Sequence, residues 1–84
     1  MKSSISVNTE YYKTSDLSLA AALYCYDYQI AEIDRSNVRK VVFCISQDER
    51  IDQLIRLYFS NEMKVSPLSY FNALKTLKSR IYNA

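Results

Sequence analysis

The chain has 84 residues, a formal net charge of +2, and hydrophobic and charged fractions of 49% and 24%. These values are typical of one small folded domain and exclude a chain that is mainly disordered. Histidine, glycine and tryptophan are absent. Without histidine no Ser–His–Asp triad can form, and without glycine there is neither a P-loop nor a dinucleotide-binding fingerprint. We therefore expect no enzyme, no catalytic residue and no cofactor.

The two cysteines, Cys25 and Cys44, lie in apolar runs with no CxxC spacing. A secreted chain of this size usually carries more cysteines, so the pattern favours a reducing, cytoplasmic compartment. The longest uncharged stretches hold ten residues each. A membrane-spanning helix needs about 20 residues, so no contact with a membrane is expected. No apolar leader segment precedes Glu10.

Residues 1–13 are predicted to be an N-terminal arm or an edge strand, because Ile5 and Val7 alternate with serines. Residues 14–84 are predicted to form a single α+β domain. Its first helix begins at Thr14-Ser15-Asp16, with Ser15 as the cap and Asp16 in the first turn. The helix is expected to end near Tyr26 and Asp27. Its predicted apolar face consists of Leu17, Ala20, Ala21, Leu23 and Tyr24.

Two strands follow, over Tyr28–Arg35 and Val38–Ile45, and the second is rich in β-branched and aromatic residues. Ser36 and Asn37 are predicted to form the turn of an antiparallel hairpin, with Asn37 at positive φ. A two-residue turn sets the register of the hairpin. In that register, the paired residues are Asp34 with Arg39 and Ile30 with Phe43.

Two helices complete the predicted domain. Ser46 and Glu49 have the spacing of a capping box at the start of the second helix, which ends at Asn61-Glu62. Ser66-Pro67 begins the third helix, because proline is well tolerated at the first helical position. The expected core stripes are Ile51, Leu54, Ile55 and Tyr58 in the second helix, and Tyr70, Leu74, Leu77 and Ile81 in the third.

Three segments, TSDLSLAAALYC, IDRSNVRKVVFCI and VSPLSYFNALKTLKSRIYN, carry a resemblance over residues 14 to 82. Together they resemble a small bacterial and phage family known only as a domain of unknown function. The resemblance implies a compact stand-alone α+β domain, an origin in a phage or mobile element, and an accessory or anti-host role. It implies no ligand or catalytic residue. Relatives have glycine near Tyr26-Asp27-Tyr28 and proline at the position of Val38.

Charge is distributed unevenly along the chain. Residues 1–62 hold seven basic and nine acidic residues, whereas residues 63–84 hold four basic residues and no acid. Aromatic and basic side chains on one flank of a helix can stack on bases and contact phosphates. Lysines near a helix C-terminus also offset the helix dipole, which is the structural alternative. The predicted nucleic-acid-binding residues are Phe71, Lys75, Lys78, Arg80 and Tyr82.

Acidic residues cluster at the start of the second helix, where Asp48, Glu49 and Asp52 lie within five positions. Such a cluster can bind a divalent cation weakly, but acids at a helix N-terminus are explained by the helix dipole. We therefore predict no metal site. The strand acids Glu32 and Asp34 are a second same-face pair, and Arg39 across the predicted hairpin explains Asp34 better than a metal ion does.

Eight tyrosines in 84 residues are more than a domain of this size can bury. Tyrosine is also common in the centres of protein interfaces. The first hypothesis is therefore a non-enzymatic binding module that contacts a protein partner, or a second copy of itself as a homodimer. Binding of nucleic acid is the alternative. The predicted protein-binding residues, chosen for expected exposure, are Tyr11, Tyr12, Tyr24, Tyr26 and Tyr28.

Overall fold

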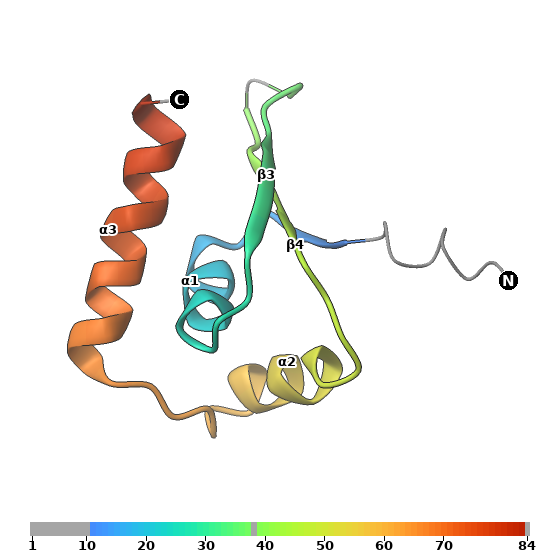
Figure 1. Ribbon diagram of the computed structural model, residues 1–84, viewed down its shortest axis with the longest axis vertical. Helices are drawn as coiled ribbons and strands as arrows, with labels where there is room; N and C mark the ends of the chain where they lie inside the picture. The colour runs from blue at the N-terminus through green and yellow to red at the C-terminus, as the bar shows by residue number, and fades with distance from the viewer. Residues whose placement is uncertain (1–10, 38, 84) are drawn as a thin grey trace, which may run out of the picture.

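The computed structural model describes residues 11–37 and 39–83. Within these ranges three helices and a three-stranded antiparallel sheet confirm the α+β class (Figure 1). The predicted strand at Ile5 and Val7 lies outside the described residues. The elements in chain order are β2 (Tyr12–Thr14), α1 (Leu17–Cys25), β3 (Ile30–Asp34), β4 (Val42–Ile45), α2 (Ile51–Phe59) and α3 (Pro67–Asn83).

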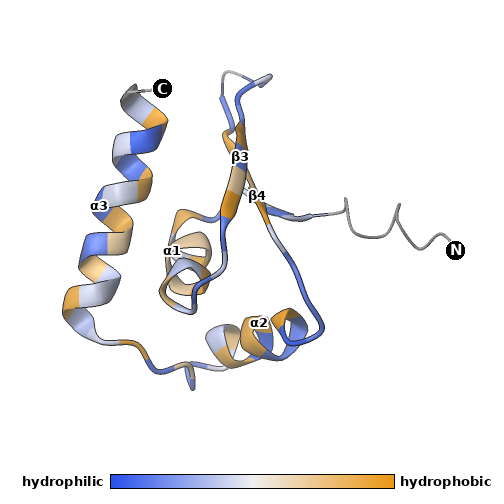
Figure 2. Ribbon diagram, viewed as in Figure 1, coloured by the Kyte–Doolittle hydropathy of each residue, from blue (hydrophilic) through white to orange (hydrophobic). Residues whose placement is uncertain are grey.

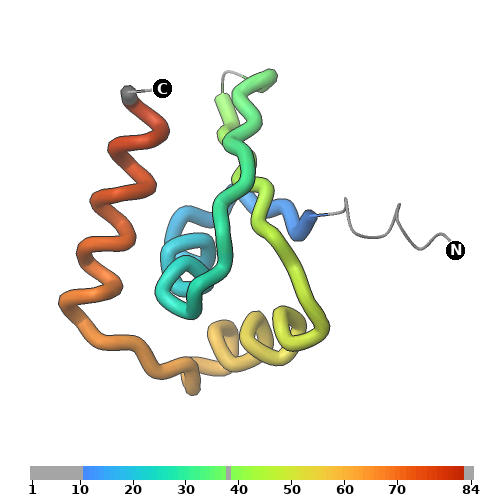
Figure 3. The backbone as a smooth tube through the Cα atoms, in the orientation of Figure 1, coloured from blue at the N-terminus to red at the C-terminus, as the bar shows by residue number. Residues whose placement is uncertain are grey.

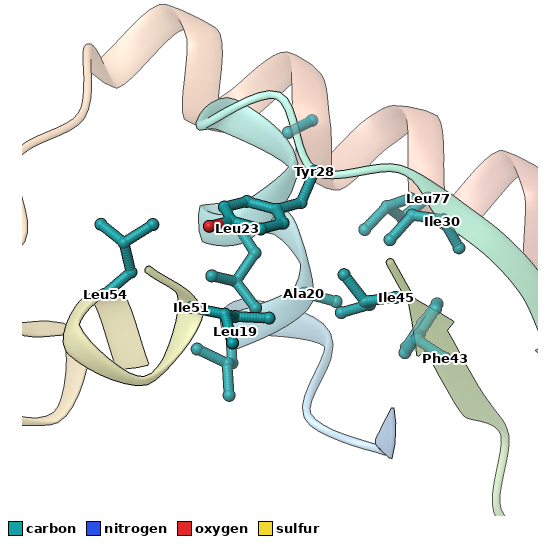
Figure 4. Packing of buried hydrophobic residues seen from close by; sticks show 12 residues of the cluster. Leu19, Ala20, Leu23, Tyr28, Ile30, Phe43, Ile45, Ile51, Leu54 and Leu77 are labelled. Carbon is teal, nitrogen blue, oxygen red and sulfur yellow. The ribbon is translucent and has the colours of Figure 1, made fainter. Parts of the chain in front are cut away.

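Helix α1 occupies the centre of the domain. All five residues from Leu19 to Leu23 are buried, with at most 2% of their surface exposed. The predicted one-sided apolar face is therefore too narrow, and Tyr24, placed on that face, is exposed instead. Figure 1 shows α1 between α3 and the strands, and contacts join it to β2, α2 and α3. Figure 4 shows the core that surrounds it, in which Leu23, Ile45 and Leu77 come from different elements.

Both short helices end without glycine. The first helix is capped at its start by Asp16, whose Oδ1 accepts a hydrogen bond from Leu19 N at 3.2 Å, and not by Ser15 as predicted. At their C-terminal ends, Asp27 and Asn61 adopt the left-handed region, with φ of 71° and 69°. Asp and Asn tolerate this region better than other residues with a side chain.

The sheet has the order β2-β4-β3, so the central strand is β4. The predicted hairpin register is wrong, because Ile33 is opposite Phe43 and Asp34 is opposite Val42. The connecting loop is longer than two residues: Asn37 Oδ1 accepts from the backbone N–H of Arg39, and Asp34 Oδ1 accepts from that of Ser36, each at 2.9 Å. A tight two-residue turn requires positive φ angles that glycine normally supplies. Among the described residues, positive φ occurs only at Asp27 and Asn61.

The predicted capping box at the start of α2 is also wrong. Ser46 belongs to the end of the sheet, where its N–H donates to Gln29 O at 2.9 Å and its Oγ accepts from Gln29 N at 3.1 Å. The helix therefore begins at Ile51, after a turn in which Asp48 Oδ1 accepts from Arg50 N at 3.0 Å. The predicted core stripe is confirmed: Ile51 and Leu54 are buried, and Ile55 and Tyr58 are partly buried against the core.

Helix α3 begins at Pro67 as predicted and packs along α1. Its core stripe is confirmed and extended by one residue, because Ala73 and Leu77 are buried while Tyr70, Leu74 and Ile81 pack partly buried against the core. Figure 2 shows apolar and polar residues alternating along the helix, as expected when one side only faces the core. No described helix is long and apolar enough to cross a membrane.

Leu77 and Leu68 lie in the same helix but differ in burial. Leu77 is 0% exposed and Leu68 is 68% exposed, so the same substitution at both positions measures the effect of burial. We expect Leu77→Ala to lower the free energy of unfolding by about 2–5 kcal/mol, because it leaves a cavity in the core. Leu68→Ala should change it by less than about 0.5 kcal/mol. Urea denaturation of both variants measures the difference. Equal losses would show that α3 is not docked through the Leu77 side.

Candidate functional site

The five predicted protein-binding tyrosines do not form one exposed surface. Tyr11 and Tyr24 are exposed by 39% and 37%. Tyr12 is partly buried against the core. Tyr26 is also partly buried, and its hydroxyl donates to Lys64 O at 2.6 Å. Tyr28 is only 5% exposed, so the expectation that it is exposed is wrong.

Tyr28 instead connects the end of α1 to the start of α2. Its hydroxyl donates a hydrogen bond of 2.6 Å to Asp48 Oδ1, and the Arg50 guanidinium lies 5.9 Å from the centre of its ring. The hydroxyl donation is the main reason why the pKa of Asp48 lies below its ordinary value of 3.8. Burial of the phenol, followed by this contact with Asp48, raises the pKa of Tyr28. The Asp48 carboxylate therefore has a structural role.

A continuous stripe of exposed side chains runs along the side of α3 that faces away from the core. Its members are spaced alternately by three and four residues, which places them on one face of a helix. Leu68, Phe71 and Tyr82 are exposed by 68%, 56% and 80%. Lys75 and Lys78 are exposed as well, and Lys75 Nζ lies 5.3 Å from the centre of the Phe71 ring. We call this the outer stripe: Leu68, Phe71, Lys75, Lys78 and Tyr82.

Arg80, the remaining predicted nucleic-acid contact, belongs to a different side of α3. It follows Lys78 by two residues, so it is turned by about 200° around the helix. Its Nη2 donates to Ile30 O in β3 at 3.3 Å, while its own carbonyl accepts from the Arg35 guanidinium. These two hydrogen bonds join the C-terminal half of α3 to β3 and the loop that follows it. Arg80 thus has a structural contact that the outer stripe lacks.

A pocket of about 420 Å³ opens where α1, the end of α2 and the start of α3 meet. Figure 3 shows the connection between α2 and α3 passing below α1 at this place. We call it the interhelical pocket. Most of its lining is apolar or aromatic, and its full lining is Asp16, Ala22, Tyr58, Phe59, Asn61, Met63, Val65 and Tyr70.

The cysteine and acidic residues do not form a metal-binding cluster in the part of the chain that is described. Cys25 and Cys44 are free thiols, and burial raises the pKa of Cys25. No three Cys, Asp or Glu side chains of residues 11–37 and 39–83 lie close enough to hold a metal ion. Asp34 accepts from the N–H of Ser36, which lowers the pKa of its carboxyl.

The interhelical pocket could not be found from the sequence. The sequence predicts that Asp16 is a charge that matches the helix dipole and that Tyr58 is a core residue, and both descriptions are compatible with lining a pocket. The missing information is tertiary, because the start of α1 meets the end of α2 about 40 residues later in the chain. Leu68 is not among the predicted binding residues, although its helical spacing from Phe71 was sufficient to place it on the outer stripe.

The geometry defines a small α+β domain with an exposed apolar and basic helix face and a pocket lined in part by aromatic residues. The chain belongs to the domain of unknown function family DUF5659, whose sequence pattern matches residues 9–83. This confirms the resemblance to an uncharacterised domain family. No curated protein and no solved structure matches the chain.

The contact between Tyr28 and Asp48 makes a prediction about acid stability. A carboxyl group whose pKa is lowered by folding stabilises the fold at pH values above its ordinary pKa of 3.8. This contribution is lost as the pH falls through the folded-state pKa. In Tyr28→Phe we expect the pKa of Asp48 to rise toward 3.8 and the acid-dependent loss of stability to shrink. NMR titration of the Asp48 carboxyl carbon measures the pKa. Urea denaturation from about pH 2 to about pH 6, a range that includes that pKa, measures the loss of stability. Tyr82→Phe, at an exposed site, should change neither.

Proposed function

We propose that this protein is a non-enzymatic binding module that contacts a protein partner through the outer stripe of α3. The observation that carries the proposal is the exposure of Leu68, Phe71 and Tyr82, at 68%, 56% and 80%, on a helix whose other side completes the core. Three large apolar side chains aligned on one exposed helix face are characteristic of a docking surface. Tyr11 and Tyr24 remain candidates for peripheral contacts.

The lysines argue against a second copy as the partner on this stripe. Apolar residues lie at both ends of the stripe, and Lys75 and Lys78 lie in its middle. If two copies paired along the full stripe, Lys75 would lie opposite Lys75 in either orientation. Like charges placed opposite each other destabilise an interface. The arrangement therefore favours a partner with a different sequence.

The chemistry of that partner follows from the same arrangement. Apolar side chains of the partner would contact Leu68 and Phe71 at one end and Tyr82 at the other. Acidic side chains between them would face Lys75 and Lys78. No acid lies within α3 to compete for these lysines. An amphipathic helix with carboxylates between two apolar anchors has this pattern.

The test uses a synthetic amphipathic helix with two apolar anchors and three central glutamates, and the same peptide with glutamines. Lys75→Glu combined with Lys78→Glu should weaken binding of the acidic peptide by at least about tenfold, equivalent to about 1.4 kcal/mol. The matched control is Arg39→Glu with Lys40→Glu, which makes the same charge change at exposed loop positions. Fluorescence anisotropy measures the affinities.

Three results would contradict the proposal. The glutamine peptide could bind as tightly as the glutamate peptide, or the control variant could lose as much affinity as the α3 variant. Sedimentation could also show a dimer of the protein that Phe71→Ala separates into monomers, which would assign the stripe to self-association.

Single-stranded nucleic acid is the second candidate, and a specific feature of α3 favours it. The outer stripe combines exposed aromatic rings with lysines, and Ser69, Asn72 and Thr76 are exposed on the adjacent face of the helix. Aromatic rings stack on bases, lysines contact phosphates, and neutral polar side chains form hydrogen bonds with base edges.

A mixed-sequence single-stranded oligonucleotide tests this candidate. If it binds to the outer stripe, the affinity should fall steeply with salt, and the Lys75→Glu, Lys78→Glu variant should abolish binding. Phe71→Ala should cost about 1–3 kcal/mol for each base that stacks on the ring. Binding that persists in the double lysine variant would exclude the outer stripe as the contact.

A further inference from the structure

The interhelical pocket has a chemistry different from that of the outer stripe. Its inner surface is apolar and polar in similar measure, and the apolar part includes Ala22 from α1 and Met63 and Val65 from the connection between α2 and α3. The lining residues that carry a polar side-chain group are Asp16, Tyr58, Asn61 and Tyr70. A ligand that fits must therefore have an apolar stem together with a polar head.

The only charged side chain that lines the pocket is Asp16. Its Oδ1 accepts from Leu19 N at 3.2 Å, which fixes the carboxylate at the start of α1. Among residues 11–37 and 39–83 the single ion pair is Arg50 with Asp48, so Asp16 has no cationic partner there. Lys64 lies between two lining residues of the connection but does not line the pocket itself. The polar head of a ligand should therefore be positive.

Electrostatics at this end of the pocket agree with that conclusion. Burial and the negative charge of Asp16 raise the pKa of the Tyr58 phenol above its ordinary value of 10.0, so the hydroxyl remains neutral. The C-terminal end of α2, beside Phe59 and Asn61, adds the negative pole of a helix dipole, whereas the N-termini of α1 and α3, beside Asp16 and Tyr70, add positive poles. The preference for a cation therefore rests on the full negative charge of Asp16.

The aromatic rings of the pocket are held in place before any ligand binds. Tyr58 and Phe59 pack edge to face, with ring centres 5.0 Å apart and an interplanar angle of 85°. The Tyr70 hydroxyl donates to Ser18 O at 3.1 Å, which fixes that ring at the start of α3. Phe59 is 66% exposed, so its ring is accessible to an incoming group. Aromatic faces attract ammonium and guanidinium groups.

We propose that the interhelical pocket binds a lysine or arginine side chain of a partner protein, with the apolar stem against Met63 and Val65 and the cationic head between Asp16 and the aromatic rings. This site is separate from the outer stripe, and its preference for charge is opposite. It would accept a basic group, whereas the outer stripe would accept an acidic one. A partner that engaged both would need charges of both signs.

The test titrates the whole protein with capped single amino acids and follows the backbone amide signals of Met63 and Val65 by NMR. The probes are the N-acetyl, N-methylamide derivatives of lysine and arginine, and the norleucine derivative is the uncharged control of similar shape. We expect millimolar binding of the two cationic probes and at least fivefold weaker binding of norleucine. Equal binding of norleucine, or no signal change with any probe, would overturn the proposal.

Two variants assign the binding to the proposed groups. Asp16→Asn removes the charge and keeps a good helix cap, so the protein should remain folded while lysine binding falls to the norleucine level. Phe59→Leu keeps an apolar side chain but removes the ring, and should weaken lysine binding at least twofold. The control Glu49→Gln removes one exposed negative charge that does not line the pocket. An equal loss in Glu49→Gln would reduce the effect to overall charge and overturn the proposal.

A further titration distinguishes binding of a protein side chain from binding of a free amine. Butylammonium has the lysine head and stem but no peptide groups. If it bound as tightly as the capped lysine, the pocket would be assigned to free amines rather than to a partner protein. Tighter binding of the capped lysine would support recognition of a side chain on a peptide backbone. Neither result depends on the outer stripe, so failure here leaves the proposed function of α3 to its own test.

Discussion

The arrangement of the whole domain depends on helix α1, because its central residues are apolar and are buried on every side of the helix. Residues 19–23 of α1 are buried in succession, so the sheet, α2 and α3 must each cover part of it. Three of these five residues are alanines, which allow neighbouring elements to approach closely. The inner sides of α2 and α3 pack against α1. The candidate sites therefore lie elsewhere: the outer stripe on the exposed face of α3, and the interhelical pocket where the three helices meet.

The absence of glycine decides how the chain changes direction. Asp27 and Asn61 each end a helix in the left-handed region, and the next N–H bonds back to the helix: Tyr28 N to Leu23 O at 3.2 Å, and Glu62 N to Leu57 O at 2.9 Å. This is the Schellman arrangement usually made with glycine. These hydrogen bonds fix the direction in which the chain leaves the helix, and therefore the position of the residue after the turn. After the first helix that residue is Tyr28, and its ring enters the core while its hydroxyl reaches Asp48.

Periodic patterns predicted the core stripes of α2 and α3 well, whereas local cap and turn signals were correct only in part. Helix α3 buries Leu77 as its spacing indicates and begins at Pro67 as the Ser66-Pro67 signal indicates, because both features depend only on residues in or next to that helix. Ser46 has the spacing of a helix cap, but the sheet uses its backbone and hydroxyl groups first. The exposed face of α3 followed from the same periodicity. The interhelical pocket did not, because it depends on how three helices pack.

The sheet has one further consequence for the behaviour of two copies together. Strand β2 has only three residues, and its pairing with β4 joins segments separated by about 30 positions. Thr14 and Tyr12 cover one edge of a strand whose Phe43, Cys44 and Ile45 are buried. If β2 separates, an apolar strand with unpaired backbone groups becomes accessible. An identical β2 from another molecule would fit there in the same register, so local opening of this strand is the step at which domain swapping can begin.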